Sequence, residues 1–354
     1  MRRRAFAIAV VALVACSDSS GPGSNLPART FRMGFSAIPP RLTQESVLET
    51  IEAWSARADA AIMHVSVPYG SMLDGNSATT YVNAVDLPLA NYYRGKNLRI
   101  VVTLDVTNGL DRSAEAPDLV TLGRSITEAE IQQLYRDYAL AVASIIKPDQ
   151  LFLAAETNLI RWAAPDSVYD AMVTMTNAAA GDIAALPAPR PAVGVSVQVE
   201  VAWGRLIGGN VYQGVETDFT DFPFVAALGL SSYAYLAFPE PEDVPLDYYA
   251  RLRNGRTTPL FVVEGGWASG NVSTVVSTPQ KQVRYLRHHE KMLDSAKVSG
   301  LFQLTYTDLD VESFGLPPGS ALPIFALNGM VDVDLAPKLS LATYDSIFAR
   351  PLAR

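Results

Sequence analysis

The chain has 354 residues, of which 49% are hydrophobic and 18% are charged, so it is long enough for one large barrel or for two ordinary domains. Its formal net charge of −8 argues against nucleic acid as a partner, because surfaces that bind nucleic acid are usually basic. A single cysteine excludes an intramolecular disulfide.

The N-terminus has the features of a secretory signal, because Arg2, Arg3 and Arg4 precede an apolar run over residues 5–15. This run is too short to span a bilayer as a helix of the mature protein. The only cysteine, Cys16, ends the sequence Leu-Val-Ala-Cys, which resembles the lipobox of bacterial lipoproteins. The resemblance implies that Cys16 is lipidated and becomes the mature N-terminus. The alternative is an ordinary signal peptide with an incidental cysteine.

We therefore divide the chain into a signal peptide (residues 1–15), a lipidated cysteine with a flexible linker rich in Ser, Gly and Pro (16–29), and one domain (30–354). Removal of the signal takes away three arginines and no acidic residue, which changes the formal charge from −8 to −11. The expected location is the bacterial cell envelope, on the periplasmic or outer-membrane face. Membrane contact is expected through the lipid anchor only.

From residue 30 onward, short apolar runs typical of buried strands alternate with longer amphipathic stretches typical of helices. The eight predicted strands cover residues 31–36, 61–67, 98–104, 151–155, 192–199, 227–232, 260–263 and 300–305. The predicted helices cover residues 43–57, 79–93, a stretch from about Thr127 that Pro148 ends, 166–186 with Asp166 as its cap, 246–254, 278–297 and 340–348. The fifth strand-helix unit has the weakest helical pattern, because residues 203–221 are Gly-rich and have little helical periodicity.

Eight strand-helix units in one uninterrupted domain predict the α/β class and a single (β/α)₈ TIM barrel. No linker rich in Pro, Gly and Ser lies between the units. A doubly wound parallel sheet is the alternative.

Two glutamates follow predicted strands directly, Glu156 after the fourth and Glu264 after the seventh. In a barrel, the C-terminal ends of all strands meet at one mouth, so both side chains would face one cavity. Two carboxylates in one pocket suit glycoside hydrolysis, and the retaining mechanism needs them about 5–5.5 Å apart. The alternative is that each glutamate is a solvated charge at the junction of a strand and a loop.

Three segments, at 153–156, 230–235 and 263–267, resemble the large clan of retaining (β/α)₈ glycoside hydrolases. Within this clan, segment 230–235 most resembles endo-β-1,4-galactanases. Residues 325–344 resemble the C-terminal motif of many members. The resemblance implies that Glu156 is the acid/base, that Glu264 is the nucleophile and that Tyr233 hydrogen-bonds the nucleophile. It also implies a poly- or oligosaccharide substrate and no cofactor.

One departure from the clan concerns the residue before the acid/base, which is usually an asparagine that binds the sugar 2-hydroxyl and here is Ala155. Asn158 could take its place from the next turn. Gln303, Thr305 and Tyr306 stand where a tryptophan platform is frequent. Because of Ala155, the second hypothesis is a non-catalytic carbohydrate-binding lipoprotein with a degenerate glycosidase barrel, and a third is a structural surface protein.

Three further residues are predicted to contact substrate. Tyr235 lies on the same side of an extended segment as Tyr233, Trp267 could form a wall on which a sugar stacks, and Gln198 ends the fifth strand. His64 lies within the second strand, where a hydrogen-bonded core residue is expected. Nothing around the histidines predicts a metal site. A monomer is expected.

Overall fold

The computed structural model describes residues 26–353. The predicted signal peptide, Cys16 and the linker up to residue 25 lie outside this range. Within residues 26–353, no helix is both long enough and apolar enough to cross a membrane.

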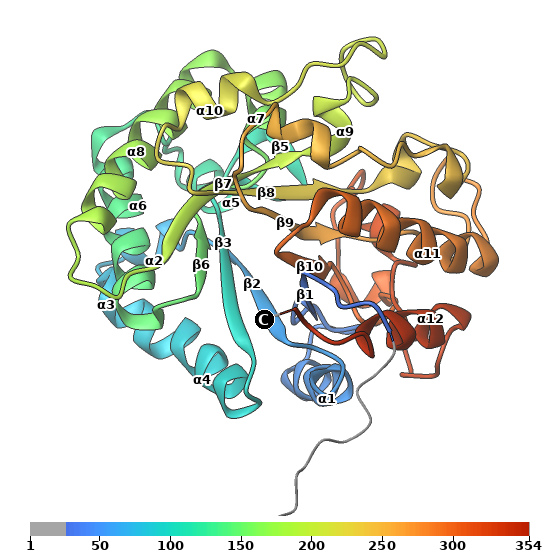
Figure 1. The fold of residues 1–354 in the computed structure, drawn as a ribbon. Coiled ribbons are helices and arrows are strands. Elements are labelled where there is room, and N and C mark those ends of the chain that lie inside the picture. Colours follow the sequence, from blue (N-terminus) through green and yellow to red (C-terminus); the bar gives the residue numbers. More distant parts are fainter. Residues whose placement is uncertain (1–25, 354) are drawn as a thin grey trace, which may run out of the picture.

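Eight parallel strands close into a barrel in the order β1-β10-β9-β8-β7-β6-β3-β2, with the helices packed around it (Figure 1). The barrel strands are β1 (Arg32–Phe35), β2 (Ala60–Ser66), β3 (Arg99–Asp105), β6 (Gln150–Phe152), β7 (Ala192–Gln198), β8 (Ala227–Ser232), β9 (Leu260–Gly265) and β10 (Gly300–Gln303). The predicted single (β/α)₈ barrel is confirmed, and the doubly wound sheet is excluded because the sheet is closed.

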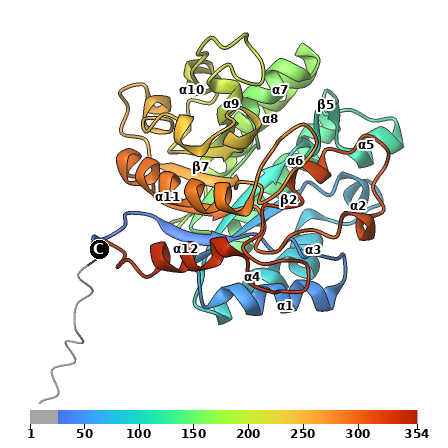
Figure 2. The ribbon, with the colours of Figure 1, turned by 90° about the vertical axis from the view of Figure 1, so that its right-hand side faces the viewer.

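The helices are α1 (Gln44–Ser55), α2 (Tyr69–Leu73), α3 (Ala78–Tyr81), α4 (Leu87–Gly95), α5 (Pro117–Leu122), α6 (Ala129–Ala141), α7 (Thr157–Ala163), α8 (Asp166–Ala184), α9 (Val199–Ala202), α10 (Glu216–Asp221), α11 (Pro279–Ala296) and α12 (Leu339–Phe348). A short antiparallel hairpin, β4 (Thr107–Asn108) and β5 (Asp111–Glu115), follows β3. In Figure 2 the hairpin strand β5 lies on the opposite side of the molecule from the C-terminus.

Three helix predictions need correction. The stretch 79–93 is divided by a π-helical turn, Val82–Asp86, between α3 and α4. Pro88 explains the break, because it has no N–H for an i→i−4 bond. Residues 246–254 contain only the 3₁₀ turn Ala250–Arg253, and Asn254 ends it with a positive φ of 45°. Asp166 is the first residue of α8 and not its cap, which is Pro165.

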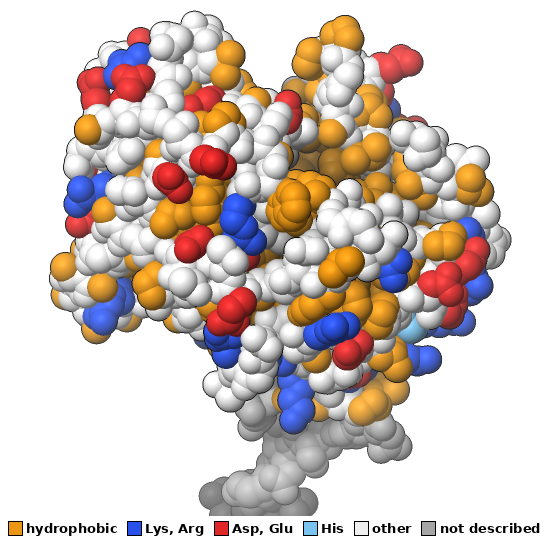
Figure 3. Space-filling model, turned by 90° about the horizontal axis from the view of Figure 1, so that it is seen from above, with side chains coloured by type: hydrophobic (Ala, Val, Ile, Leu, Met, Phe, Trp, Pro, Cys, Tyr) orange, Lys and Arg blue, Asp and Glu red, His pale blue; other side chains and the backbone are white. Residues whose placement is uncertain are grey.

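The core has two parts, a large apolar layer between the barrel and the helices and a smaller cluster inside the barrel. Two glycines let neighbouring strands approach closely. A Cβ at Gly34 would lie 1.9 Å from the Ala60 carbonyl oxygen, and one at Gly194 would lie 1.9 Å from that of Ala227. The close strand contacts fix the barrel that carries the loops around its mouth. In the space-filling view of Figure 3 the surface is hollowed between two raised parts, and hydrophobic side chains gather along the hollow.

Candidate active site

The carboxyl ends of the strands surround a cavity of about 190 Å³. Glu156 and Glu264 both line it, as the barrel topology predicts. The other polar lining residues are His64, Thr103, Asp105, Arg112 and Tyr233, and the apolar lining includes Ile38, Leu110, Ala155, Leu304, Leu322 and Phe325. The cavity is therefore charged at its centre and has several apolar side chains in its wall.

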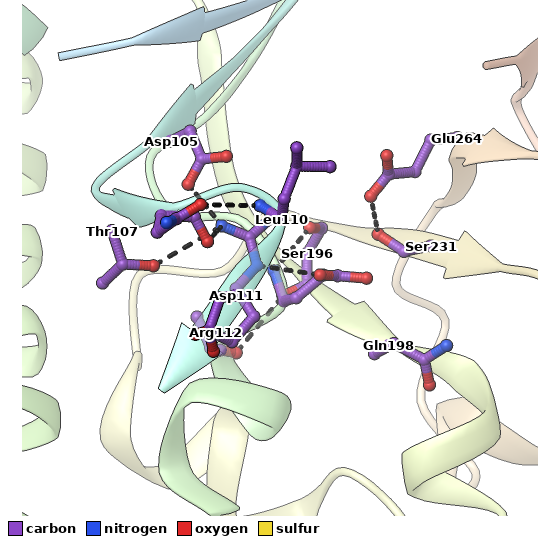
Figure 4. A network of polar contacts seen from close by, with 12 residues as sticks. Asp105, Thr107, Leu110, Asp111, Arg112, Ser196, Gln198, Ser231 and Glu264 are labelled. Carbon is purple, nitrogen blue, oxygen red and sulfur yellow. Dashed lines mark hydrogen bonds and ion pairs between the residues drawn. The ribbon is translucent and has the colours of Figure 1, made fainter. Parts of the chain in front are cut away.

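Glu264, near the end of β9, is held by two hydroxyl groups. Ser231 Oγ donates to Oε1 at 2.5 Å, and the Tyr233 hydroxyl donates to Oε2 at 3.1 Å (Figure 4 shows the Ser231 contact). An irregularity in the pairing of β8 with β9 places Ser231 beside Glu264. Burial raises the pKa of Glu264, and the two hydroxyls and Arg112 act against that rise by stabilising the carboxylate.

Glu156 follows β6 and precedes α7 in a left-handed backbone conformation, with φ 50° and ψ 46°. Such a conformation is unfavourable for residues other than glycine and is often found at functional sites. Ser196 Oγ accepts the Glu156 N–H at 3.0 Å and so holds this turn. The backbone is therefore distorted at Glu156, where the chain leaves β6 and the carboxylate side chain enters the cavity lining.

Arg112 connects the Glu156 carboxylate to a third acidic residue. Its Nε–H donates to Glu156 Oε2 at 2.9 Å. Its Nη1 forms an ion pair with Asp105, at the end of β3, and Figure 4 labels both of these residues. Arg112 is 7% exposed and comes from β5 of the hairpin. The buried guanidinium compensates part of the negative charge that three carboxylates bring to one cavity.

The electrostatic environments of the two glutamates differ. Burial raises the pKa of Glu156 to about 7; Arg112 opposes this rise and the charge of Glu264 adds to it. Glu264 instead accepts hydrogen bonds from two neutral hydroxyls at both its oxygens. Glu156 can thus carry a proton near neutral pH, whereas Ser231 and Tyr233 stabilise the carboxylate form of Glu264 against the rise in pKa that burial causes. This difference agrees with the division of roles that acid-assisted nucleophilic displacement requires.

Of the predicted substrate-binding residues, Tyr233 lines the cavity, and Asn158 and Gln198 do not. The Asn158 side chain pairs with the Gln198 backbone, accepting from its N–H at 2.7 Å and donating to its carbonyl at 2.9 Å. The Gln198 side chain donates to Glu200 at 2.5 Å and accepts from the Val201 N–H at 2.7 Å. Asn158 therefore does not replace the asparagine that is missing at Ala155.

Trp267 and Tyr235 also lie outside the cavity lining. The Trp267 indole is 2% exposed, donates to Ser277 Oγ at 3.0 Å and packs against Tyr285 with ring centroids 4.9 Å apart. The Tyr235 hydroxyl donates to the Ile324 carbonyl at 2.9 Å. Neither side chain offers the cavity a surface on which a sugar could stack.

Two functional candidates escaped prediction from the sequence, Arg112 and Ser231. Arg112 is the only basic residue between positions 106 and 123. A single positive charge in the loop after the third strand could therefore have indicated a partner for the carboxylates. Ser231 had no such signal, because its contact depends on an irregularity in strand pairing. Asp105 was recognisable from its position after the third strand.

Glu200, in α9, is a further buried acid that the sequence did not single out. It is completely buried and accepts from the Tyr233 N–H at 3.1 Å, the Tyr248 hydroxyl at 2.9 Å and the Ser232 hydroxyl at 3.3 Å. Burial raises its pKa to about 7. Glu200 thus supports the backbone of the tyrosine that holds Glu264.

No protein-family profile and no curated protein matches the chain. Solved structures do resemble it: a GH5_18 protein from Streptomyces cattleya in complex with GlcNAc has a TM-score of 0.61 and 14% identity, covering 92% of this chain and 83% of its own. The exo-β-1,4-mannosidase Op5Man5 from Opitutaceae bacterium strain TAV5 has a TM-score of 0.60 and 12% identity over 91% of this chain and 59% of its own.

A β-glucuronidase from Ruminococcus gnavus, in complex with uronic isofagomine, has a TM-score of 0.60 and 12% identity over 90% of this chain. The chain spans about half the length of that protein, 51%. The chain has the (β/α)₈ fold of glycoside hydrolases. At these identities the likeness concerns the fold alone, and the closer resemblance to endo-galactanases stays a prediction. The chemistry of a (β/α)₈ barrel depends on the residues at its mouth, because the same fold hosts many unrelated functions.

Proposed function

We propose that the protein is a retaining glycoside hydrolase that acts on a poly- or oligosaccharide, with Glu264 as nucleophile and Glu156 as acid/base. The observation that carries the proposal is the pair of buried carboxylates in one cavity, at the ends of β6 and β9, with different hydrogen-bond partners. The glycoside hydrolase fold of the barrel supports it.

In the first step, Glu264 attacks the anomeric carbon and forms a glycosyl ester, while Glu156 gives its proton to the leaving oxygen. In the second step, Glu156 removes a proton from water, which attacks the same carbon and releases Glu264. Arg112 binds Oε2 of Glu156. Within residues 26–353 no hydrogen bond to Oε1 is found, so Oε1 is the atom that we assign to the proton transfer.

The experiment is a panel of 4-nitrophenyl glycosides and oligosaccharides, tested first with the wild-type protein. For an accepted glycoside, Glu264→Gln should lower kcat by at least about 10³-fold, because the nucleophile is lost. Glu156→Ala should retain activity on activated aryl glycosides, with azide accelerating the second step. Glu242→Gln, at an exposed position, is the control. A Glu264→Gln protein with the wild-type rate would overturn the proposal.

A second candidate function, a carbohydrate-binding protein without turnover, is favoured by Ala155 and by the ion pair that Arg112 makes with the proposed acid. The same panel separates the two functions. Binding of a sugar measured by calorimetry, with no hydrolysis of any glycoside in the panel, would select the binding protein.

We also propose that the mature protein is a lipoprotein of the cell envelope, anchored through Cys16, and that it is a monomer. The proposal is supported by the signal-like residues 1–15 and by the position of the single cysteine. Cys16→Ser should abolish labelling by radioactive palmitate and move the protein from the detergent phase to the aqueous phase. Unchanged partitioning of the Cys16→Ser protein would contradict the anchor, and light scattering measures the mass in solution.

A further inference from the structure

The end of the barrel opposite the mouth carries basic side chains that have no acidic partner. Because all eight strands are parallel, the loops that lead into them lie together at this end. These loops cover residues 56–59, 96–98, 147–149, 185–191, 222–226, 254–259 and 297–299. Within the described residues, four exposed basic side chains of this end form no ion pair, namely Arg32, Lys147, Arg190 and Lys297.

The acidic residues of the same loops do not neutralise these four charges. The loops contain two acidic residues, Asp59 and Asp149. Asp59 pairs with Arg29 at 2.6 Å, and Asp149 pairs with Arg99 at 2.7 Å. Both carboxylates are thus already engaged by other arginines, and this end of the barrel keeps an excess of positive charge.

The opposite end of the barrel is acidic. Three long loops follow β3, β8 and β10 at the mouth, over residues 106–128, 233–249 and 304–338. Together they contain 13 acidic and three basic residues. The charges of a protein that is acidic overall are therefore separated along the barrel axis. A charged surface that attracts one end of the barrel repels the other.

The four unpaired basic side chains form two pairs around the barrel. Arg32 is the first residue of β1, and Lys297 leads into β10, which pairs with β1. Lys147 leads into β6 and Arg190 into β7, and these two strands also pair. Two strands separate the pairs on either side, so the pairs lie across the barrel from each other. A flat surface that contacts both pairs lies perpendicular to the barrel axis.

The chain enters the domain at this same end. The Arg29 N–H donates to the Pro351 carbonyl at 2.9 Å, and Figure 2 shows the C-terminus on the opposite side of the molecule from the hairpin strand β5. Cys16 lies ten residues before Leu26, the first described residue, and ten residues span at most about 35 Å. A domain of this size is about 50 Å across. An anchor at Cys16 would therefore hold the basic end, and not the mouth, beside the membrane.

We infer that this basic end docks on the anionic phospholipid headgroups of the leaflet that holds the lipid anchor. The inference rests on the proposed anchor at Cys16 and is independent of the proposed hydrolysis. Anionic headgroups attract lysine and arginine side chains near the bilayer, and a lipid chain and a basic surface commonly act together. Docking sets the barrel axis perpendicular to the bilayer and turns Glu156 and Glu264 away from the lipid.

The test places a fluorescent label on the full-length lipidated protein in vesicles. Cys16 is the only native cysteine, and lipidation blocks its thiol, so the label attaches only to an introduced cysteine. Thr257→Cys, in an exposed loop before β9, reports on the basic end, and Ser313→Cys, exposed after β10, reports on the mouth. The vesicles contain phosphatidylcholine alone or phosphatidylcholine with phosphatidylglycerol, and nitroxide groups on the lipid headgroups quench any label that contacts them.

The label at Thr257→Cys should be quenched strongly in vesicles with phosphatidylglycerol and weakly in phosphatidylcholine alone. The label at Ser313→Cys should be quenched weakly in both. Adding Lys147→Gln and Lys297→Gln, one from each pair, should lower the ratio of docked to undocked protein about 25-fold, because each lysine near an anionic surface contributes about fivefold.

Arg205→Gln/Arg287→Gln is the matched control, since it changes the net charge equally at two exposed positions, in the loop after β7 and in α11. It should leave the quenching unchanged. Raising the salt to 0.5 M shortens the Debye length to roughly 4 Å and should release the wild-type protein from the phosphatidylglycerol surface. Thermal unfolding checks each variant, and the salt dependence decides the inference if the lysine variant does not fold.

Equal quenching of the Thr257→Cys label in both kinds of vesicle, or equal effects of the lysine and arginine replacements, would overturn docking on anionic lipid. A label that responds to an added anionic polysaccharide and not to phosphatidylglycerol would also overturn it. If the wild-type protein incorporates no palmitate, the anchor fails, and the secreted protein is sedimented with the same vesicles. Sedimentation with phosphatidylglycerol that Lys147→Gln/Lys297→Gln abolishes would then support the basic surface, and no sedimentation would overturn it.

Discussion

Arg112 donates its Nε–H to Oε2 of Glu156 at 2.9 Å, and this ion pair is almost completely buried. The other side of the guanidinium contacts Asp105, so the arginine is fixed from both sides. An acid/base residue with a permanent cationic neighbour is easier to ionise, which opposes its function as an acid and favours its function as a base. Arg112 thus influences the two halves of the proposed reaction in opposite directions.

Replacing Arg112 by methionine should shift the pH dependence of hydrolysis. Arg112 lowers the pKa of Glu156, and burial and the charge of Glu264 raise it. Without the arginine the pKa of Glu156 rises, so the proton needed for the first step is retained to higher pH. The alkaline limb of kcat/KM against pH should therefore move up by about one unit or more.

A pH profile of a second arginine variant, measured in the same way, is the control for the Arg112 prediction. Arg136 forms a partly exposed ion pair with Asp182 on the helices around the barrel, and Arg136→Met should leave the alkaline limb in place. An Arg112→Met profile identical to wild type would mean that Glu156 is not the group that titrates in that limb.

The two hydroxyls on Glu264 predict a second pH effect, on the acidic limb. Ser231 and Tyr233 both lower the pKa of Glu264 by donating to its oxygens. Ser231→Ala or Tyr233→Phe should raise that pKa, so activity should begin to fall at a higher pH as the nucleophile becomes protonated. A hydrogen bond to a charged group contributes about 1.5–3 kcal/mol, which corresponds to a 10- to 100-fold loss of kcat/KM at low pH.

Tyr235→Phe is the matched control for these substitutions, because its hydroxyl donates to the Ile324 carbonyl and has no contact with Glu264. The acidic limb of Tyr235→Phe should match that of the wild type. If all three variants shift the limb equally, the cause is a general loosening of the site and not the two hydrogen bonds.

The sequence predicted the barrel well because the pattern of buried strands is local. Residues 227–232 were predicted as a strand and are β8, and Thr278 caps α11 through a bond to the Lys281 N–H. Glu156 and Glu264 could be placed because strand order alone brings their positions to one mouth. Side-chain direction was not predictable for Trp267, since an indole after a strand packs equally well into the surrounding aromatic layer.

The polar side chains around the cavity could not be predicted in the same way, because their contacts join segments far apart in the chain. His64 was expected to be a hydrogen-bonded core residue, but its buried Nε2 has no hydrogen-bond partner among the described residues. Arg112 reaches Glu156 only because the hairpin after β3 folds back over the mouth. Both outcomes are set by tertiary contacts between segments far apart in the chain.

Glu200 predicts a pH dependence of stability. Its pKa is raised from 4.5 to about 7 by burial, so the folded protein binds a proton that the unfolded chain has lost between these two values. The free energy of unfolding should therefore fall as pH rises from about 5 to about 7, and this group should contribute about 3 kcal/mol of that fall. Glu200→Gln, which cannot ionise, should reduce the fall, as measured by urea unfolding at pH 5, 6, 7 and 8.

Glu156 contributes to the same pH range, because its pKa is also raised to about 7. The double variant Glu156→Gln/Glu200→Gln should therefore be less dependent on pH than either single variant. Exposed Glu242 provides the control, and Glu242→Gln should leave the slope unchanged. A slope that Glu200→Gln leaves intact would contradict the assignment of this titration to the buried acid.

Arg29 ties the start of the barrel to the end of the chain and should be a major contributor to stability. It is 3% exposed, makes an ion pair with Asp59 at 2.6 Å and donates to the Arg350 carbonyl at 3.1 Å. Arg29→Met should lower the free energy of unfolding by about 3 kcal/mol, because Asp59 loses its charged partner and carbonyls near both chain ends lose their donor. Arg99→Met removes an exposed ion pair with Asp149 and should cost less than about 1 kcal/mol. Denaturant unfolding measures both variants, and equal losses would show that the buried contacts of Arg29 do not hold the two ends of the chain together.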